Sequence, residues 1–283
     1  MRFVPDDPGV WRRAGIRPRV NSSGGVQLRL DAIDALETHF SPQGSRRVWR
    51  QPPELAVAAT EALLRALGFT GWHRDPDTGT ISDPVPGSVA GTILTAAADV
   101  NGRPIALILA GDAPPDTDAP VAVSTQLLRA TVNQALLADG LVYPTFYSEL
   151  ADSLRSELAA IAAAARAAGR GVWAADVTTA GFTLTSPRQL ETEIVVLPKL
   201  FRRLAEYLAP ESGSVSLAGF EAFLAMSADP VRVLPSGTDT TLAELVRVDG
   251  QRVALTVAPE LLVFAEKQTR FRALTERGRP PRG

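Results

Sequence analysis

The chain has no cysteine among its 283 residues, and its histidines are limited to His39 and His73. The absence of cysteine excludes disulfide bonds, thiolate metal ligands and a cysteine nucleophile. Two histidines are too few for a multi-histidine zinc or iron site. Any metal chemistry would therefore depend on carboxylate and carbonyl oxygens, which are ligands for calcium, magnesium or manganese.

The sequence also lacks an excess of positive charge and a long apolar segment. Its net charge is −2 and its pI about 5.8, so a polyanionic partner would need a local basic patch. No uncharged apolar run reaches the ~18 residues of a membrane span. Residues 1–11, MRFVPDDPGVW, carry acids and prolines where a signal peptide needs an apolar core. We therefore expect a cytoplasmic protein with no membrane partner.

What the chain does contain is 45% hydrophobic and 21% charged residues, enough for one large domain or two small ones. Residues 9–20 are predicted as an edge strand because they include a proline, and the alternation over 26–32 predicts a half-buried strand. A helix is predicted from Pro53 to the residue before Gly68, whereas turn signals over 69–88 favour irregular structure.

Further along, two apolar runs flank Asn101-Gly102 and predict a hairpin, followed by helices over 124–140 and 146–168. The composition changes after residue 175, where a capping box predicts a helix over 187–208 and Asp249-Gly250 predicts a second hairpin. A boundary is placed near 176–186. The predicted parts are residues 9–175, a C-terminal α+β domain over 186–270, and a basic disordered tail over 271–283.

The sequence LRLDAIDALETHF, residues 28–40, ends a predicted strand with a charged turn. Arg29, Asp31, Asp34 and Glu37 lie beside His39. One interpretation is a solvated strand end whose acids pair with the arginine. The other is a site in which carboxylates and a guanidinium act on a phosphate, because a carboxylate can take a proton and a guanidinium can bind phosphate oxygens.

Four motifs in order resemble the thermonuclease (staphylococcal nuclease-like) family over about residues 9–175. LRLDAIDALETH is similar to the family's arginine-containing strand and its Asp-x-Pro-Glu-Thr turn, and NGRPIALILAGD to its Gly-Arg strand. VNQALLADGLVYP is similar to a family helix, and AARAAGRGVW to the Arg-x-Gly-Leu-Trp end. The resemblance implies an α+β fold: a five-stranded OB-fold barrel with packed helices. The C-terminal region would add a smaller α/β region of unknown fold.

The resemblance also implies roles for single residues. Arg29 and Arg103 match the two phosphate-binding arginines, and Glu37 matches the general base. Asp34 matches a calcium ligand, and Ala35 matches a position that binds the metal through its main-chain carbonyl. A plain hairpin-edge arginine is the alternative interpretation of Arg103.

The metal-site motif is degenerate in this chain. No acid lies within residues 12–17, where the family has a further calcium aspartate, and Leu36 replaces the proline of the turn. Asp31 is predicted to share a face with Arg29, because side chains two apart on a strand point the same way. Asp31 would then either complete a site for Ca²⁺ or another divalent cation, or neutralise Arg29.

The loop before the predicted helix at Pro53 contains SRRVWR. Arg46, Arg47 and Arg50 surround Trp49, a pattern that suits phosphate contact and base stacking in nucleic-acid binding. An exposed loop with one anchored tryptophan is the alternative.

Together these features predict a metal-dependent phosphodiesterase, a nuclease that hydrolyses DNA or RNA. Glu37 would activate water, and the two arginines would stabilise charge on phosphorus. The alternative is a catalytically degenerate module of the same family that binds single-stranded nucleic acid or a protein partner. Because Arg29, Glu37 and Arg103 lie outside the predicted apolar core, replacing them is expected to leave stability nearly unchanged.

Overall fold

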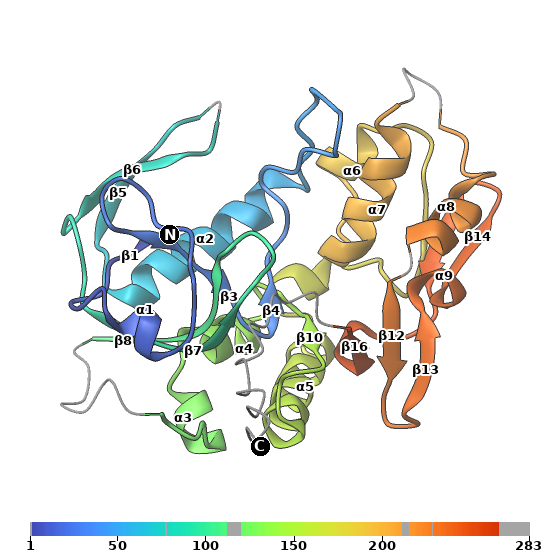
Figure 1. Cartoon of the computed structure of the whole chain (residues 1–283). Helices are drawn as coiled ribbons and strands as arrows, with labels where there is room; N and C mark the ends of the chain where they lie inside the picture. The colour runs from blue at the N-terminus through green and yellow to red at the C-terminus, as the bar shows by residue number, and fades with distance from the viewer. Residues whose placement is uncertain (1, 77, 112–119, 211–214, 228, 266–283) are drawn as a thin grey trace, which may run out of the picture. The chain divides into compact units, whose positions relative to one another are not determined.

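The computed structural model describes residues 2–76, 78–111, 120–210, 215–227 and 229–265 (Figure 1). The fold is mixed α+β, with several small sheets of two to four strands. The chain divides into two compact units: the first includes the described residues up to Arg29 and Leu94–Ala106, the second Leu30–Ile93 and the described residues from Leu107 onwards. The tail predicted at 271–283 lies outside the described residues.

The first unit begins with an antiparallel pair, β1 (Arg2–Phe3) and β2 (Val26–Gln27). Between them lies a helical turn, α1 (Val10–Arg13), whose Trp11 is buried. The predicted edge strand over 9–20 is therefore wrong at these residues. The reason is local: the Asp7 carboxylate accepts hydrogen bonds from the backbone N–H before α1 and from the arginine at its end, which stabilises a helical turn.

The hairpin predicted at Asn101-Gly102 is confirmed. The strands β7 (Gly91–Ala98) and β8 (Pro104–Ala110) are neighbours in a sheet of order β3-β8-β7, with β3 at Arg29–Leu30. Gly102 has φ 74°, a left-handed conformation that the turn requires and glycine adopts without strain.

The single strand predicted over 26–32 is broken in the structure. The strand β2 ends at Gln27 and β3 ends at Leu30. The next strand, β4 (Ile33–Asp34), begins only after Ala32, which has φ 64°. A left-handed alanine interrupts the alternation of side chains, because the backbone changes direction there. Asp31 lies between β3 and β4, and the face that it was predicted to share with Arg29 stays a prediction.

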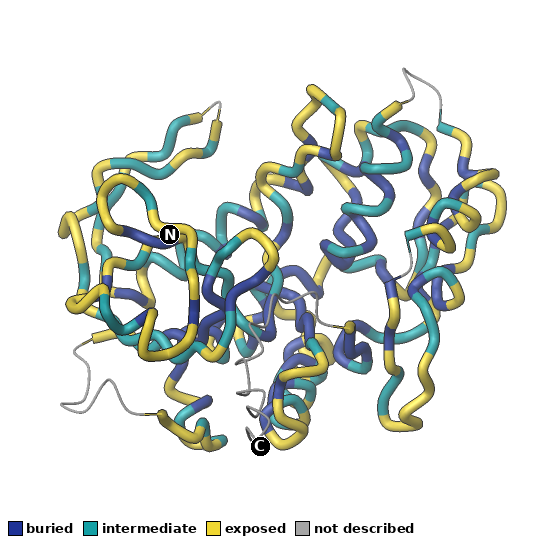
Figure 2. The backbone as a smooth tube through the Cα atoms, viewed as in Figure 1, coloured by how far each residue is buried: buried dark blue, intermediate teal, exposed yellow. Residues whose placement is uncertain are grey.

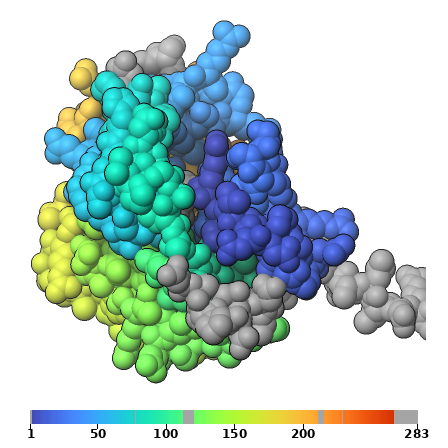
Figure 3. Space-filling model, turned by 90° about the vertical axis from the view of Figure 1, so that its left-hand side faces the viewer, coloured from blue at the N-terminus to red at the C-terminus, as the bar shows by residue number. Residues whose placement is uncertain are grey.

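In the second unit, the helix predicted from Pro53 is confirmed as α2 (Pro53–Leu67), ended by Gly68 with φ 101°. The irregular structure predicted over 69–88 is wrong, because β5 (Gly71–Arg74) and β6 (Ile81–Val85) form an antiparallel pair. The turn signals lie in its connection, and a register shift near Gly71 breaks the regular strand pattern. Figure 3 shows this hairpin in cyan on the facing surface.

The predicted helix over 124–140 is two helices, α3 (Thr125–Arg129) and α4 (Val132–Ala138), because the Thr131 side chain accepts a hydrogen bond from the Gln134 N–H and caps the second. The following helix, α5 (Asp152–Ala167), starts later than predicted. Ahead of it, β9 (Tyr143–Pro144) pairs with β4. The strand β10 (Phe146–Tyr147) pairs in parallel with β16 (Leu262–Phe264). No helix in the described residues has the length and apolar character to cross a membrane.

Two motif glycines let backbone segments approach closely. Gly140 follows α4 with φ 69°, and Gly171 opens the 3₁₀ turn η1 (Gly171–Ala174) with φ 53°. A Cβ on Gly140 would lie 2.4 Å from the Arg170 carbonyl oxygen, and one on Gly171 would lie 2.3 Å from the Gly140 oxygen. The glycines in two of the quoted motifs therefore meet in space, and neither position has room for a side chain.

The C-terminal part of the second unit contains short helices and two further sheets, ordered β10-β16-β12-β13 and β11-β15-β14. The hairpin predicted at Asp249-Gly250 is confirmed as β14 and β15. The predicted helix over 187–208 is two helices, α6 and α7, and Pro198 begins the second. The bounds are β11 (Phe182–Thr183), α6 (Gln189–Thr192), α7 (Pro198–Leu208), α8 (Phe220–Ser227), β12 (Pro230–Val233), β13 (Thr238–Thr241), α9 (Leu242–Leu245), β14 (Val246–Asp249), β15 (Arg252–Leu255), η2 (Pro259–Leu261) and β16 (Leu262–Phe264).

The division predicted near 176–186 stays a prediction, but the second unit has contacts between segments on both sides of it. One cluster of buried side chains includes Leu36 and Trp49 before this point and Phe264 after it. Figure 2 colours the backbone by burial, and buried segments are dark blue. The Arg166 guanidinium of α5 pairs with the buried Glu260 carboxylate. The N-terminal and C-terminal segments of this unit therefore share a hydrophobic core.

Candidate functional site at the turn after β4

The charged turn predicted from the sequence begins at the end of β4, where the backbone of Asp34 lies opposite that of Tyr143 in the antiparallel strand β9. Two residues later Leu36 is 3% exposed and belongs to the core cluster. The buried leucine anchors the turn, while Asp34 and Glu37 on either side of it stay half-buried. Leu36 therefore holds the turn in place by packing.

The side chain that meets these carboxylates is Arg202, from α7. Its Nη2 lies 3.0 Å from Asp34 Oδ2, and its Nη1 donates a hydrogen bond to Glu37 Oε1. The side chains of Arg202, Asp34 and Glu37 are 24%, 28% and 20% exposed. One guanidinium thus bridges two carboxylates in a partly desolvated site, where hydrogen bonds between charged groups are strong.

Burial by itself would lower the pKa of Arg202, but the charges of Asp34 and Glu37 outweigh it and raise that pKa above its usual range. The guanidinium therefore stays protonated at every pH at which the protein is folded. Arg202 therefore supplies a fixed positive charge between the two carboxylates.

Packing holds α7 against the turn independently of charge. The buried Gln51 accepts a hydrogen bond from the Glu37 N–H through Oε1, and its Nε2 donates to the Val196 carbonyl just before α7. The rings of Phe40 and Phe201 meet edge to face, with centroids 6.4 Å apart. These contacts fix the position from which Arg202 reaches the turn.

Sequence reasoning missed Arg202 because it lies 168 and 165 positions from its two partners. The available signal was the pattern of α7, in which the buried residues recur at helical spacing and leave Arg202 at their edge. That pattern predicts an amphipathic helix, but it does not indicate which segment the helix packs against.

The arginines of the predicted catalytic set lie in the first unit. The Arg103 guanidinium donates to the buried Asp99 carboxylate, with Nε 2.7 Å from Oδ2, and this pair closes the turn between β7 and β8. Asp99 also accepts hydrogen bonds from the Asn101 and Arg103 N–H groups. The hairpin interpretation of Arg103 thus has a defined structural basis. A joint site of Arg29, Glu37 and Arg103 stays a prediction.

The residues present do not fit the implied calcium ion. Among the described residues, no group of three or more acidic or histidine side chains is arranged to hold a metal. The Asp34 carboxylate, the predicted ligand, binds Arg202. Asp31 follows β3, and its carbonyl accepts a hydrogen bond from Nδ2 of the buried Asn133. Ala35 is exposed.

The basic loop forms a narrow turn closed by a bridge between Phe40 and Trp49. Its light-blue tip projects beside α6 in Figure 1. Trp49 is 1% exposed, and the Arg47 guanidinium covers its ring at 4.0 Å from the centroid. Base stacking by Trp49 does not fit this burial. The tryptophan instead anchors the loop and supports Arg47, while Arg46 and Arg50 are exposed.

Beside this loop lies a shallow cleft of about 390 Å³. Arg47, Arg50 and Arg188 line it, together with Pro53, Glu191 and Thr192. Arg47 Nη2 pairs with Glu191 Oε2 at 2.5 Å, which leaves a surplus of positive charge. Among the described residues, no carboxylate pairs with Arg50 or Arg188. Sequence reasoning found the loop arginines but missed Arg188, which comes from the segment before α6.

The other basic residues at the start of α7 bind a different carboxylate. Lys199 Nζ lies 3.2 Å from Asp229 Oδ1, and Arg203 Nε lies 2.6 Å from Oδ2 of the same carboxylate. Burial lowers the pKa of Lys199 from 10.5 to about 8, against the opposing effect of the Asp229 charge. The ammonium also lies over the Phe264 ring.

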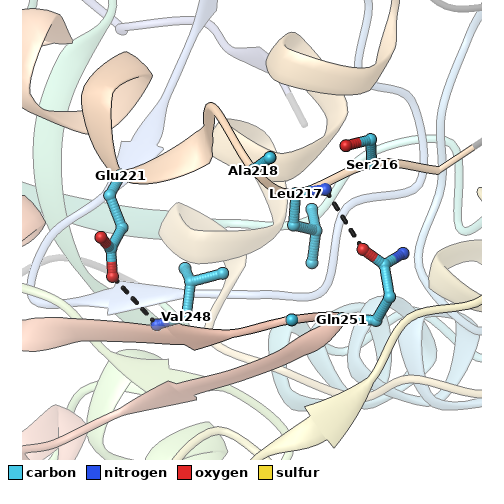
Figure 4. Close-up of a pocket in the computed structure, with 7 residues that line it drawn as sticks. Ser216, Leu217, Ala218, Glu221, Val248 and Gln251 are labelled. Carbon is cyan, nitrogen blue, oxygen red and sulfur yellow. Dashed lines mark hydrogen bonds between the residues drawn. The ribbon is translucent and has the colours of Figure 1, made fainter.

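A second shallow pocket, of about 380 Å³, lies between α8 and the β14–β15 hairpin (Figure 4). The Val248 N–H donates to Glu221 Oε1, and the Leu217 N–H donates to Gln251 Oε1. These internal bonds use polar groups that a ligand would otherwise contact, so the pocket favours a structural role.

The comparisons with known proteins add no family assignment. A scan against protein-family models finds no family that matches the chain, and a search of curated proteins finds no match.

Proposed function

We propose that this protein is a thermonuclease-like module that binds single-stranded nucleic acid without metal-dependent cleavage. The observation that carries the proposal is the cleft beside the basic loop, where Arg47, Arg50 and Arg188 converge with one acid, Glu191. Guanidinium groups bind phosphate oxygens in pairs and neutralise the backbone of a nucleic acid strand. Arg47 is held by its ion pair with Glu191 and by its contact with the Trp49 ring, so its side chain loses little conformational entropy when a phosphate binds.

The absence of catalysis is supported by the Arg202 bridge. A general base must be able to accept a proton from water, whereas the Glu37 carboxylate accepts a hydrogen bond from the Arg202 guanidinium. Asp34, the predicted metal ligand, is bound to the same guanidinium. The nuclease activity that the resemblance implies remains the second candidate, and the binding experiment below also tests it.

The proposal includes the five-stranded OB barrel and a cytoplasmic location. In support of the barrel, two motifs lie in elements of the expected kind: the β7–β8 hairpin, whose turn contains Arg103, and the helix α4. The lack of cysteine fits a cytoplasmic setting. DNA or RNA is the proposed partner.

The test is fluorescence anisotropy with a labelled single-stranded oligonucleotide over a range of salt concentrations. Arg50→Ala and Arg188→Ala should each weaken binding and lower the slope of log K against log salt by about 0.7, the value for one lost phosphate contact on a single strand. Arg129→Ala is the matched control, because Arg129 is an exposed arginine that pairs with Glu157 outside the cleft.

The same oligonucleotide should stay intact with Ca²⁺, Mg²⁺ or Mn²⁺. Cleavage that disappears in Glu37→Gln would support the nuclease instead. Wild-type protein that neither binds nor cuts the strand would refute both candidates. Equal binding by wild type, Arg50→Ala and Arg188→Ala would show that the cleft is not the binding site.

A further inference from the structure

The Asp34–Glu37 turn contains a cation that belongs to the chain itself. Two carboxylates this close and partly buried repel each other unless a positive charge lies between them. A divalent metal ion is one solution, and a guanidinium is another. Arg202 contacts one carboxylate through each of its terminal nitrogens.

We propose that Arg202 is an internal cation that takes the place of a divalent metal ion at the Asp34–Glu37 turn. The folded chain then neither needs nor binds a metal ion there. This inference does not depend on nucleic-acid binding, since it concerns the carboxylates of the turn and not the arginine cleft.

The packing of α7 supports a specific role for Arg202 as the cation of the turn, in place of an incidental surface contact. The hydrogen bonds of Gln51 and the ring contact of Phe40 with Phe201 seat α7 at the turn without any help from charge. The neighbouring basic residues of the helix, Lys199 and Arg203, bind Asp229 instead.

A guanidinium also differs from a metal ion in ways that suit this site. It stays protonated, it cannot dissociate from the chain, and its planar fork holds two carboxylates at once. The position therefore combines charge neutralisation with attachment of α7 to the β4 turn. A metal ion would supply the first and not the second.

The experiment compares wild type, Arg202→Met and Arg203→Met by thermal unfolding with millimolar Ca²⁺ or with NaCl of equal ionic strength. Methionine keeps an unbranched apolar stem and removes the charge. Arg203 is the matched control, because it is the next residue of α7 and also binds two carboxylates, Asp229 and Glu206. Both variants should unfold at lower temperature than wild type.

Ca²⁺ should raise the unfolding temperature of Arg202→Met and restore much of its loss, because the two freed carboxylates then have a cation. It should leave wild type and Arg203→Met unchanged relative to NaCl. A Ca²⁺ effect on Arg202→Met no larger than that on Arg203→Met would overturn the proposal.

Calorimetric titration of wild type with Ca²⁺ gives a second readout that does not require the variant to fold. The proposal expects no binding heat that depends on the turn, so wild type and Glu37→Gln should give the same titration. Binding by wild type that Glu37→Gln abolishes would show a functional metal site and would overturn the proposal, whatever the behaviour of Arg202→Met.

Discussion

Replacing Glu37 by glutamine should destabilise the fold, although a general base outside the apolar core could be replaced without such a cost. The substitution keeps the shape of the side chain and removes its charge. It breaks the ion pair with Arg202 and leaves that guanidinium with Asp34 as its remaining carboxylate at the turn.

The expected loss in the free energy of unfolding depends on how far the side chains of Arg202, Asp34 and Glu37 are buried. Breaking a fully buried pair costs about 3–5 kcal/mol, whereas an exposed pair contributes about 0–1 kcal/mol. The side chains of Arg202 and Glu37 are 24% and 20% exposed, between these limits. Because Asp34 stays in place, we expect Glu37→Gln to lower the free energy of unfolding by about 2 kcal/mol.

The assay is urea unfolding of wild type, Glu37→Gln, Arg202→Met and the double variant, with a coupling energy of about 1–2 kcal/mol expected from the cycle. Glu206→Gln is the control, because Glu206 pairs with Arg203 within α7 and local helix pairs contribute only about 0.5 kcal/mol. A loss for Glu37→Gln no larger than for Glu206→Gln would refute the reasoning about the bridge.

Two further predictions concern the second unit. Gly140→Ala should lower the free energy of unfolding by several times the ~1 kcal/mol expected for Gly169→Ala. Both glycines have positive φ, but only a Cβ on Gly140 would clash with Arg170. Equal losses of the two variants in chemical denaturation would contradict the close approach. Between pH 8 and 10.5, Lys199 is protonated in the unfolded chain but has lost its proton in the folded protein. The contribution of Lys199 to the free energy of unfolding therefore rises with pH over this range. Wild type should gain on the order of 2 kcal/mol relative to Lys199→Met across that window, and parallel stability curves would exclude the lowered pKa.

The elements that the sequence predicted correctly are those with local start and stop signals. Pro53 and Gly68 bound a helix as expected, and the hairpins at Asn101-Gly102 and Asp249-Gly250 are present. These residues act through their own backbone preferences, so nearby sequence is sufficient to predict them.

The predictions that failed depended on interactions that a local pattern does not contain. Alternation over 26–32 predicted one strand, but Ala32 takes a left-handed conformation and ends it. The sequence left two interpretations of Trp49 open, and tertiary packing, which the local pattern does not contain, favours the anchored one. Arg202 reaches the turn from α7 and Arg188 reaches the cleft from the segment before α6. Both lie far along the chain, and no spacing rule connects them to the residues that they meet.

The most direct test of the central claim is a crystal structure of the protein with a short single-stranded oligonucleotide, grown in the presence of Ca²⁺. The account predicts phosphate oxygens within hydrogen-bonding distance of Arg50 and Arg188, with Arg202 still bridging Asp34 and Glu37 and no metal ion at the turn. A strand whose phosphate lies at Glu37, with Ca²⁺ bound and Arg202 displaced, would contradict it.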